Sequence, residues 1–391
     1  MMPEEQEKTK WQRFVDYVKP PPMPLAEHRT LKERLQFLKD PKFLKVLLLG
    51  QFLSLCITGT NVTTTLLAAN AMPTTQTFFN YLIVAVVYNT VAIYKRGFKG
   101  WLYQFRRRAL FYFILAFIDV EGNYFVVKAY QYTSLLSAML LDAWTTPVVM
   151  ILSFFCLRAR YRWLQYVGVI IALCGLALLV VSDVLTGKNY GAVDAVKGDL
   201  FCILGATLYG FSNVGEEFMI RKHPHYEVVG MLSFFATFIN FVQLMILERH
   251  EFAEFSKDSF SIGMMVVYTV CMFCIYSLGP IMFRMAGAVV FNLSLLTSDF
   301  YGLIFGLGLF GYTVTWLYPV AYVIVIVGIA AYHFFPVPEP GIGGFDKERQ
   351  EQERRELFGI RSETDIESQP SDVQPTDAPA DEVLTTNDEK N

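Results

Sequence analysis

The chain has 391 residues, of which 53% are hydrophobic, 15% aromatic and only 18% charged, and its formal net charge is −3. A soluble protein of this length usually carries about 25% charged residues. The shortage of charge, together with 34 phenylalanines, argues against soluble domains, and the same composition excludes a chain that is disordered throughout. The net charge and the lack of a basic domain also argue against a nucleic-acid-binding protein.

Ten apolar runs are each long enough for a helix that crosses a bilayer, which takes about 20 residues. The first run begins only after residue 42 and is too long to be the apolar part of a cleavable signal peptide. The sequence therefore predicts an all-α membrane protein with ten transmembrane helices. The ten runs lie at 43–68, 76–94, 109–131, 133–156, 163–183, 198–220, 228–247, 262–285, 288–310 and 316–335.

The distribution of basic residues predicts the orientation, because Lys and Arg are enriched on the cytoplasmic side of membrane proteins. With a cytoplasmic N-terminus, 28 of the 33 Lys and Arg residues lie in cytoplasmic segments and five lie outside. We therefore expect both termini in the cytoplasm. The plasma membrane and the Golgi or other endomembranes both remain open as the location.

The two ends of the chain differ from the apolar middle. Within the cytoplasmic segment 1–42, residues 25–40 have leucines at helical spacing among basic residues. This pattern fits a helix lying on the anionic inner leaflet and fits a plain solvated helix equally well. Residues 336–391 are polar, with nine acidic residues and one Lys from Ser362 onward, so we expect a disordered acidic tail.

The ten runs divide into two halves of five, 43–183 and 198–335. An odd number of spans in each half gives the halves opposite orientations, as in many transporters. Asp142 and Asp299 lie near the middle of the fourth and ninth spans, and Trp163 and Trp316 begin the fifth and tenth. The sequence therefore predicts two inverted five-helix repeats.

Polar residues inside the spans predict a binding site. A charge in mid-span costs at least about 2.5–3.5 kcal/mol, so it must face a cavity or a partner. Asp142 and Asp299 are the best cavity candidates, and Pro147 is expected to loosen the helix just after Asp142. Tyr209, Asn213 and Glu216 share one face of the sixth span. We expect nine residues to contact a substrate: Asp142, Asp299, Tyr209, Asn213, Glu216, Asn292, Tyr276, Asn123 and Tyr124.

A second set of charged residues is expected to form gates or ion pairs. Asp119 shares a helix face with Asn123, and Glu121 lies two turns from Lys128. A packing role without substrate contact is the alternative for both acids. An ion pair closing the inner mouth is the alternative for Glu216 and Glu217. The set comprises Asp119, Glu121, Lys128, Glu217 and Arg284.

No catalytic or cofactor motif is found. All six cysteines lie in apolar runs, so Cys271 and Cys274, although spaced as a CxxC pair, are interpreted as packing residues. The sequence has no P-loop, metalloprotease or serine hydrolase motif. We therefore predict no enzyme, no cofactor and no metal.

Several stretches of the chain form an ordered set of motifs between residues 40 and 335. They include 119–124 (DVEGNY), 128–135 (KAYQYTSL), 140–142 (LLD), 147–149 (PVV), 212–218 (SNVGEEF), 271–276 (CMFCIY) and 292–299 (NLSLLTSD). This set resembles the F subgroup of solute carrier family 35, within the drug/metabolite transporter superfamily. The resemblance implies ten helices in two inverted halves and transport by alternating access. Gly122 and Gly215 depart from the pattern, standing where relatives have Ala and Cys.

For this subgroup, the resemblance implies a queuine or queuosine substrate, that is, a modified nucleobase or its nucleoside. The residues fit such a solute, because Tyr can stack on a ring, Asn can bind its edge and a carboxylate can bind an amine. A nucleotide-sugar antiporter and a non-transporting membrane receptor or assembly factor remain as alternatives. The expected partners are a small-molecule substrate and membrane lipids, without nucleic acid, and the oligomeric state is not predicted.

Overall fold

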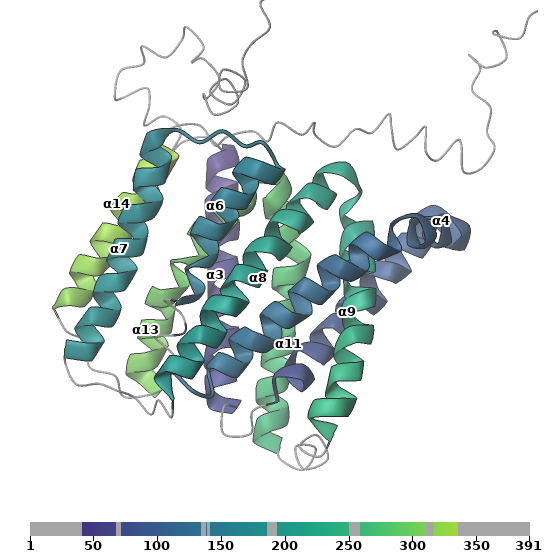
Figure 1. Cartoon of the computed structure of the whole chain (residues 1–391), viewed down its shortest axis with the longest axis horizontal. Coiled ribbons are helices and arrows are strands. Elements are labelled where there is room, and N and C mark those ends of the chain that lie inside the picture. The colour runs from purple at the N-terminus through teal and green to yellow at the C-terminus, as the bar shows by residue number, and fades with distance from the viewer. Residues whose placement is uncertain are drawn as a thin grey trace, which may run out of the picture. The chain divides into compact units, whose positions relative to one another are not determined.

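The computed structural model describes residues 41–67, 72–133, 138, 141–185, 194–249, 259–309 and 316–334. The chain divides into two units, 1–346 and 347–391, and all the described residues belong to the first. The predicted N-terminal helix at 25–40 and the acidic tail lie outside the described residues. Within those residues, all the regular structure is α-helix (Figure 1).

Each of the ten predicted runs overlaps a helix, but runs and helices do not correspond one to one. The helices are α3 (Pro41–Leu67), α4 (Pro73–Ala129), α6 (Thr145–Cys156), α7 (Trp163–Leu185), α8 (Ala195–Lys222), α9 (His225–Leu247), α11 (Ser259–Ala286), α12 (Ala288–Leu295), α13 (Ser298–Leu309) and α14 (Leu317–His333).

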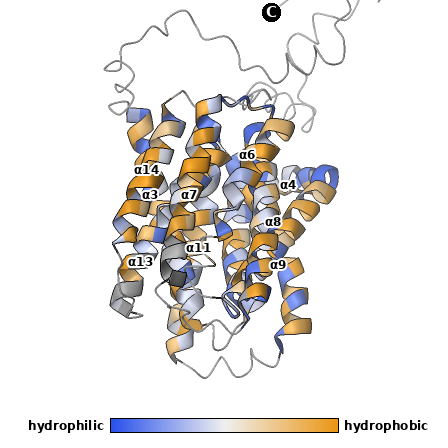
Figure 2. Ribbon diagram, turned by 60° about the vertical axis from the view of Figure 1, so that its left-hand side comes forward, coloured by the Kyte–Doolittle hydropathy of each residue, from blue (hydrophilic) through white to orange (hydrophobic). Residues whose placement is uncertain are grey.

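By length and composition, four of these helices are able to cross a membrane: α3, α4, α9 and α11. Apolar side chains face outward along them, and Leu48, Val86 and Phe238 are each about 60% exposed (62%, 59% and 63%). In Figure 2, orange stretches of hydrophobic residues recur along the ribbon of the helices. Exposed apolar area on this scale is suited to lipid rather than water. The structure thus confirms an all-α membrane protein, with four candidate membrane spans among the described residues.

Helix α4 combines the second and third predicted runs. At 57 residues, a straight helix would be about 85 Å long, nearly three times the thickness of a bilayer core of about 30 Å. The helix bends at Gly97, whose φ of 72° and ψ of 162° are not helical. A positive φ is readily adopted by glycine, which has no Cβ. We call residues 94–108, around this bend, the α4 elbow.

The fourth and ninth runs are broken, which corrects the expectation that Asp142 and Asp299 lie in mid-helix. Asp142 directly precedes a turn at 143–144, after which α6 begins. Pro147 explains this break. In a continuous helix its ring would clash with the carbonyl of the residue four positions earlier, and it has no N–H to donate to that carbonyl. Asp299 is the second residue of α13, which is separated from α12 by a turn at 296–297.

The helices pack in two sets of neighbours around the site described below. Helix α4 lies along α8 and α9, while α3 lies along α11, α12 and α13. Helix α6 lies against α8 and α12, and α7 pairs with α14. Segments from both halves of the chain therefore surround the centre of the bundle.

Candidate functional site

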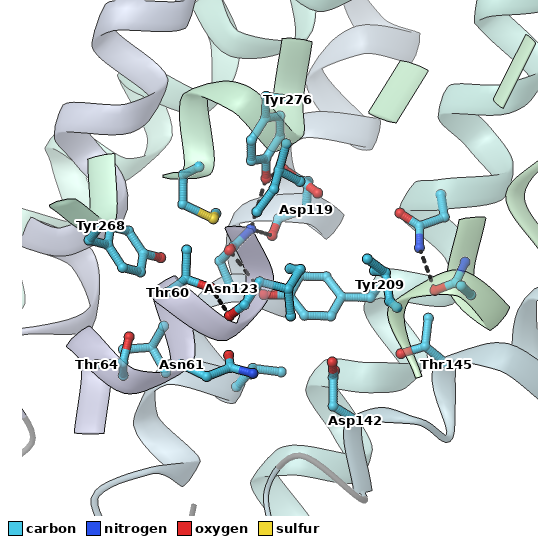
Figure 3. A pocket seen from close by; sticks show the side chains of 18 of the residues that line it. Thr60, Asn61, Thr64, Asp119, Asn123, Asp142, Thr145, Tyr209, Tyr268 and Tyr276 are labelled. Carbon is cyan, nitrogen blue, oxygen red and sulfur yellow. Dashed lines mark hydrogen bonds between the residues drawn. The ribbon is translucent and has the colours of Figure 1, made fainter. Parts of the chain in front are cut away.

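A polar cavity lies among α3, α4, α8, α11 and α12, with Asp142 and Thr145 contributed by the start of the α6 region (Figure 3). The space inside it, including the opening to solvent, is about 830 Å³. Seven of the residues predicted from the sequence line it together: Asp119, Asn123, Asp142, Tyr209, Asn213, Tyr276 and Asn292.

One end of the cavity is organised by the carboxylate of Asp119. Its Oδ2 accepts hydrogen bonds from the hydroxyls of Tyr81 (2.7 Å) and Tyr276 (2.5 Å), and its Oδ1 accepts one from Ser212 (2.8 Å). All four residues are buried. Three hydroxyl donors therefore stabilise this buried carboxylate. It is a positioning residue for α4, α8 and α11, where the sequence predicted a gate or an ion pair.

Asn123 extends this network toward the open part of the cavity. Its Nδ2 donates to the hydroxyls of Tyr81 (2.8 Å) and Tyr276 (3.0 Å), and its Oδ1 accepts from the Tyr209 hydroxyl (3.0 Å). Both ends of the amide are thus used, which fixes its orientation. The chain of donors runs from Tyr209 through Asn123 and the two tyrosines to Asp119, so the ring of Tyr209 is held at the cavity wall.

Asp142 has a different environment. Its Oδ1 is buried and has no hydrogen-bond partner among the described residues, and Figure 3 shows it on the opposite side of Tyr209 from Asp119. Burying a carboxylate without a partner is costly. The described residues that line the cavity include Asp119 and Asp142 but no Lys, Arg or His. The cavity therefore suits a ligand that brings a positive charge or hydrogen-bond donors.

Amides and hydroxyls supply the remaining polar groups of the cavity. Asn213 donates to Asn292 Oδ1 (3.3 Å), and Asn292 in turn donates to the Ala288 carbonyl (2.8 Å). On α3, the wall includes Thr60, Asn61 and Thr64.

Other lining residues were not found from the sequence. Tyr130 and Tyr268 line the cavity, and Tyr81 and Ser212 hold Asp119 from α4 and α8. Isolated tyrosines and serines within apolar runs are common, so spacing alone did not distinguish these four from lipid-facing or packing residues.

Three predicted substrate contacts lie outside the cavity lining. Asp299 is in the first turn of α13, where the helix dipole favours a carboxylate. Glu216 is buried one turn beyond Ser212 on α8. The ring of Tyr124 packs edge-on against Phe125, with centroids 5.5 Å apart.

Two of the predicted gating residues, Glu217 and Arg284, make specific contacts away from the cavity lining. Glu217 pairs with Arg221 (2.7 Å) and accepts from the Ala288 amide (2.8 Å) at the start of α12. Arg284 donates to the carbonyls of Ile220 and His223 at the end of α8.

The spacing of Glu121 and Lys128 does not lead to an ion pair among the described residues. Glu121 instead accepts a hydrogen bond of 2.6 Å from Gln243 of α9. No cluster of three or more potential metal ligands occurs in the described part of the chain.

An all-helical membrane protein with an apolar outer surface and a polar central cavity, walled by helices from both halves of the chain, has the architecture of a solute transporter. Residues 39–334 match the family model SLC35F, solute carrier family 35. The chain belongs to this family and is a multi-pass membrane transporter.

Individual relatives agree with this assignment. A solute carrier family 35 member from Schizosaccharomyces pombe is 46% identical over 302 residues, covering 77% of this chain and 60% of the relative. The mouse and Xenopus tropicalis proteins named solute carrier family 35 member F2 are 40% and 36% identical, covering 74% and 73% of this chain and 78% and 75% of theirs. A crystal structure with 14% sequence identity superposes with a TM-score of 0.55, covering 73% of this chain and 96% of the other, which shows a shared fold.

Proposed function

We propose that the protein transports a queuine- or queuosine-type nucleobase or nucleoside, and that the substrate binds in the central cavity during alternating access. The observation that carries this proposal is the cavity's combination of aromatic rings, amides and two carboxylates without a lining cation. Queuine has a planar ring system and a secondary amine, which is protonated at neutral pH. The amine suits the carboxylate of Asp142, and the ring system suits the aromatic and amide side chains of the lining.

The amine is assigned to Asp142, because that carboxylate has a buried oxygen without a partner in the described residues. The ring system is assigned to Tyr209, and its polar edge is assigned to Asn213 and Asn292, which line the same cavity. A nucleotide sugar fits less well, because its diphosphate would face Asp142 with no lining Lys or Arg.

The expected affinity follows from these contacts. Stacking of a base on an aromatic ring contributes about 1–3 kcal/mol, and a hydrogen bond to a charged group contributes about 1.5–3 kcal/mol. Micromolar binding corresponds to about −8 kcal/mol. Several of these contacts must therefore act together, which is consistent with a site built from five helices.

Uptake measurements test this assignment. Cells expressing the chain should show saturable uptake of queuine, and Asp142→Asn should reduce it by about tenfold or more, because the amine loses its charged partner. Asp194→Asn is the matched control. This residue caps α8 outside the cavity, and Asn caps a helix as well as Asp does, so this variant should keep parental uptake.

The outcomes separate the alternatives. Exchange of a nucleotide sugar without queuine uptake would assign the protein to the antiporter class. Queuine binding to the purified protein without uptake would make it a receptor or assembly factor. Parental uptake by Asp142→Asn would remove this residue from the site.

We also propose ten crossings in two inverted repeats, with both termini in the cytoplasm. The matching breaks beside Asp142 and Asp299 support this plan, as does the contact between α7 and α14, which are the fifth span of each half. The repeat makes the cavity a site between two halves that are able to rock against each other.

Labelling of the two ends of α8 tests the orientation. Cysteines introduced at the exposed positions Asp194 and Lys222 should differ from each other in their reaction with a membrane-impermeant maleimide. Labelling of the parent protein gives the background. The first should be labelled in intact cells when the protein is at the cell surface, and the second only after permeabilisation. The reverse pattern would contradict a cytoplasmic N-terminus.

A further inference from the structure

The α4 elbow (residues 94–108) lies outside the lining of the central cavity. Gly97 turns the chain, and the following helical turns pack back against α9. Trp101 donates to the Asn89 side chain (2.7 Å), and Asn89 donates to the Gly230 carbonyl of α9 (2.8 Å). Phe105 stacks on Phe235 with ring centroids 5.4 Å apart. These contacts hold one face of the elbow against the bundle.

The opposite face of the elbow carries a basic hollow. It is lined by Lys99, Leu102, Tyr103, Arg106 and Arg107, and its free volume is about 660 Å³ including the space open to solvent. These positions fall on one side of a helix, since 99, 103, 106 and 107 are separated by three or four residues. The face held by Trp101 and Phe105 thus determines the direction of the basic face.

The cations of the elbow divide into two groups. Arg96 pairs with Glu227 of α9 at 2.9 Å, and Arg108 lies 3.8 Å from the same carboxylate. Lys95 lies over the ring of Tyr226. These three cations serve the fold, because each is held against the start of α9.

The cations of the hollow have a different setting. Lys99, Arg106 and Arg107 are exposed, and none of them has an ion pair with an acidic residue among the salt bridges of the described chain. Arg107 is held in place by Tyr103, which accepts a hydrogen bond from it (2.5 Å) and places its ring beneath the guanidinium. The hollow therefore presents three positive charges and one phenol to a ligand.

The surroundings of the hollow indicate where that ligand comes from. Exposed apolar side chains flank the basic face, with Phe98 61% and Leu110 73% exposed. Basic residues beside exposed aromatic and aliphatic side chains are typical of segments at the membrane interface, where the apolar groups reach the acyl chains and the cations reach the headgroups. A phosphate ion free in solution would need no such flank.

We propose that the α4 elbow binds the headgroup of a polyanionic phospholipid, a phosphorylated inositol lipid in the leaflet that the elbow faces. Three cations converging on one hollow match a headgroup with several phosphate charges, and Arg binds phosphate through two parallel hydrogen bonds. The hollow lies on the part of α4 that follows Gly97, and the same part of the helix carries Asp119 of the cavity network. This site is independent of which solute the cavity carries.

Binding of the full-length protein to defined vesicles tests the proposal. The purified protein should bind phosphatidylcholine vesicles containing phosphatidylinositol bisphosphate in preference to vesicles containing phosphatidylserine at equal total charge. The triple variant K99Q/R106Q/R107Q should bind the first vesicles roughly a hundredfold more weakly, since each basic residue near an anionic surface contributes about a fivefold preference. The control K45Q/R158Q/K222Q removes the same charge from other exposed positions and should weaken binding to the first vesicles much less, because these residues lie outside the hollow.

Each other result would overturn the proposal. Equal weakening in both triple variants would show a general charge effect, and equal binding of the two vesicle types would show that phosphorylated inositol is not recognised. Binding of soluble inositol trisphosphate as tight as that of the lipid would make the hollow a site for a free anion. Thermal unfolding of each variant in detergent verifies that the elbow still folds, so that a change in binding reports on the lost cations.

Discussion

Replacing Asp119 with asparagine is expected to abolish transport and to lower the free energy of unfolding by about 3–5 kcal/mol. The carboxylate accepts three hydroxyl hydrogen bonds, from Tyr81, Tyr276 and Ser212. A hydrogen bond to a charged group contributes about 1.5–3 kcal/mol, and a buried donor left without an acceptor costs a similar amount. The new amide group would also point a donor at hydroxyls that already donate. We expect the helices α4, α8 and α11 to lose their common attachment point.

Glu121→Gln is the matched control for this variant. Glu121 lies on the same helix two residues away, and its half-buried side chain accepts from Gln243, a bond that the amide oxygen of Gln keeps. Thermal unfolding in detergent and uptake into cells should therefore be close to parental for Glu121→Gln. Parental values for Asp119→Asn would show that the network does not hold the cavity together.

A variant that removes a single donor tests the same network more mildly. Tyr276→Phe removes one donor and leaves Asp119 with Tyr81 and Ser212. Its effect should be smaller than that of Asp119→Asn, because two of three hydrogen bonds remain. The hydroxyl of Tyr209 is the end of the network nearest to the open cavity. Tyr209 therefore connects the proposed ligand site to the hydrogen bonds that join the helices.

The sequence predicted the class of fold because hydrophobic length is a local property. Each apolar run could be recognised without knowing its neighbours, and each overlaps a helix. Breaks at Pro147 and near Thr297 shift Asp142 and Asp299 from mid-helix to helix ends. The break at Pro147 was expected from the sequence, but the bend at Gly97 was visible only in the structure, since one glycine in a polar stretch does not specify a positive φ.

The site was only partly predictable because its contacts are remote in sequence. Asp119 was recognised as a buried charge that needs a partner, but its partners Tyr81 and Tyr276 are 38 and 157 residues away. Helical spacing suggested Lys128 for Glu121, while the actual donor is Gln243 on another helix. Periodicity shows which residues share a face. It does not show which other helix that face meets.

The contact between α7 and α14 gives the second large expected effect. Gly328→Ala should destabilise the protein strongly, because the added Cβ would lie 2.5 Å from the Ala172 amide nitrogen and 2.6 Å from the Gly168 carbonyl oxygen. Overpacking usually costs about 1–3 kcal/mol. We expect the upper end of this range here, because backbone atoms cannot rotate away and the two helices must separate.

Gly263→Ala is the control, because a Cβ at this position in α11 would meet no atom within 4 Å. Alanine stabilises a helix by up to about 1 kcal/mol relative to glycine, so this variant should unfold at the parental temperature or slightly above it. The helices α7 and α14 run antiparallel, since Gly168 meets Gly328 and Tyr332 while Gly175 meets Ala321 and Val325. Gly168→Ala should therefore reproduce the loss from the other side of the same crossing. If Gly328→Ala and Gly263→Ala unfold at the same temperature, the close approach of the two helices does not occur in the membrane protein.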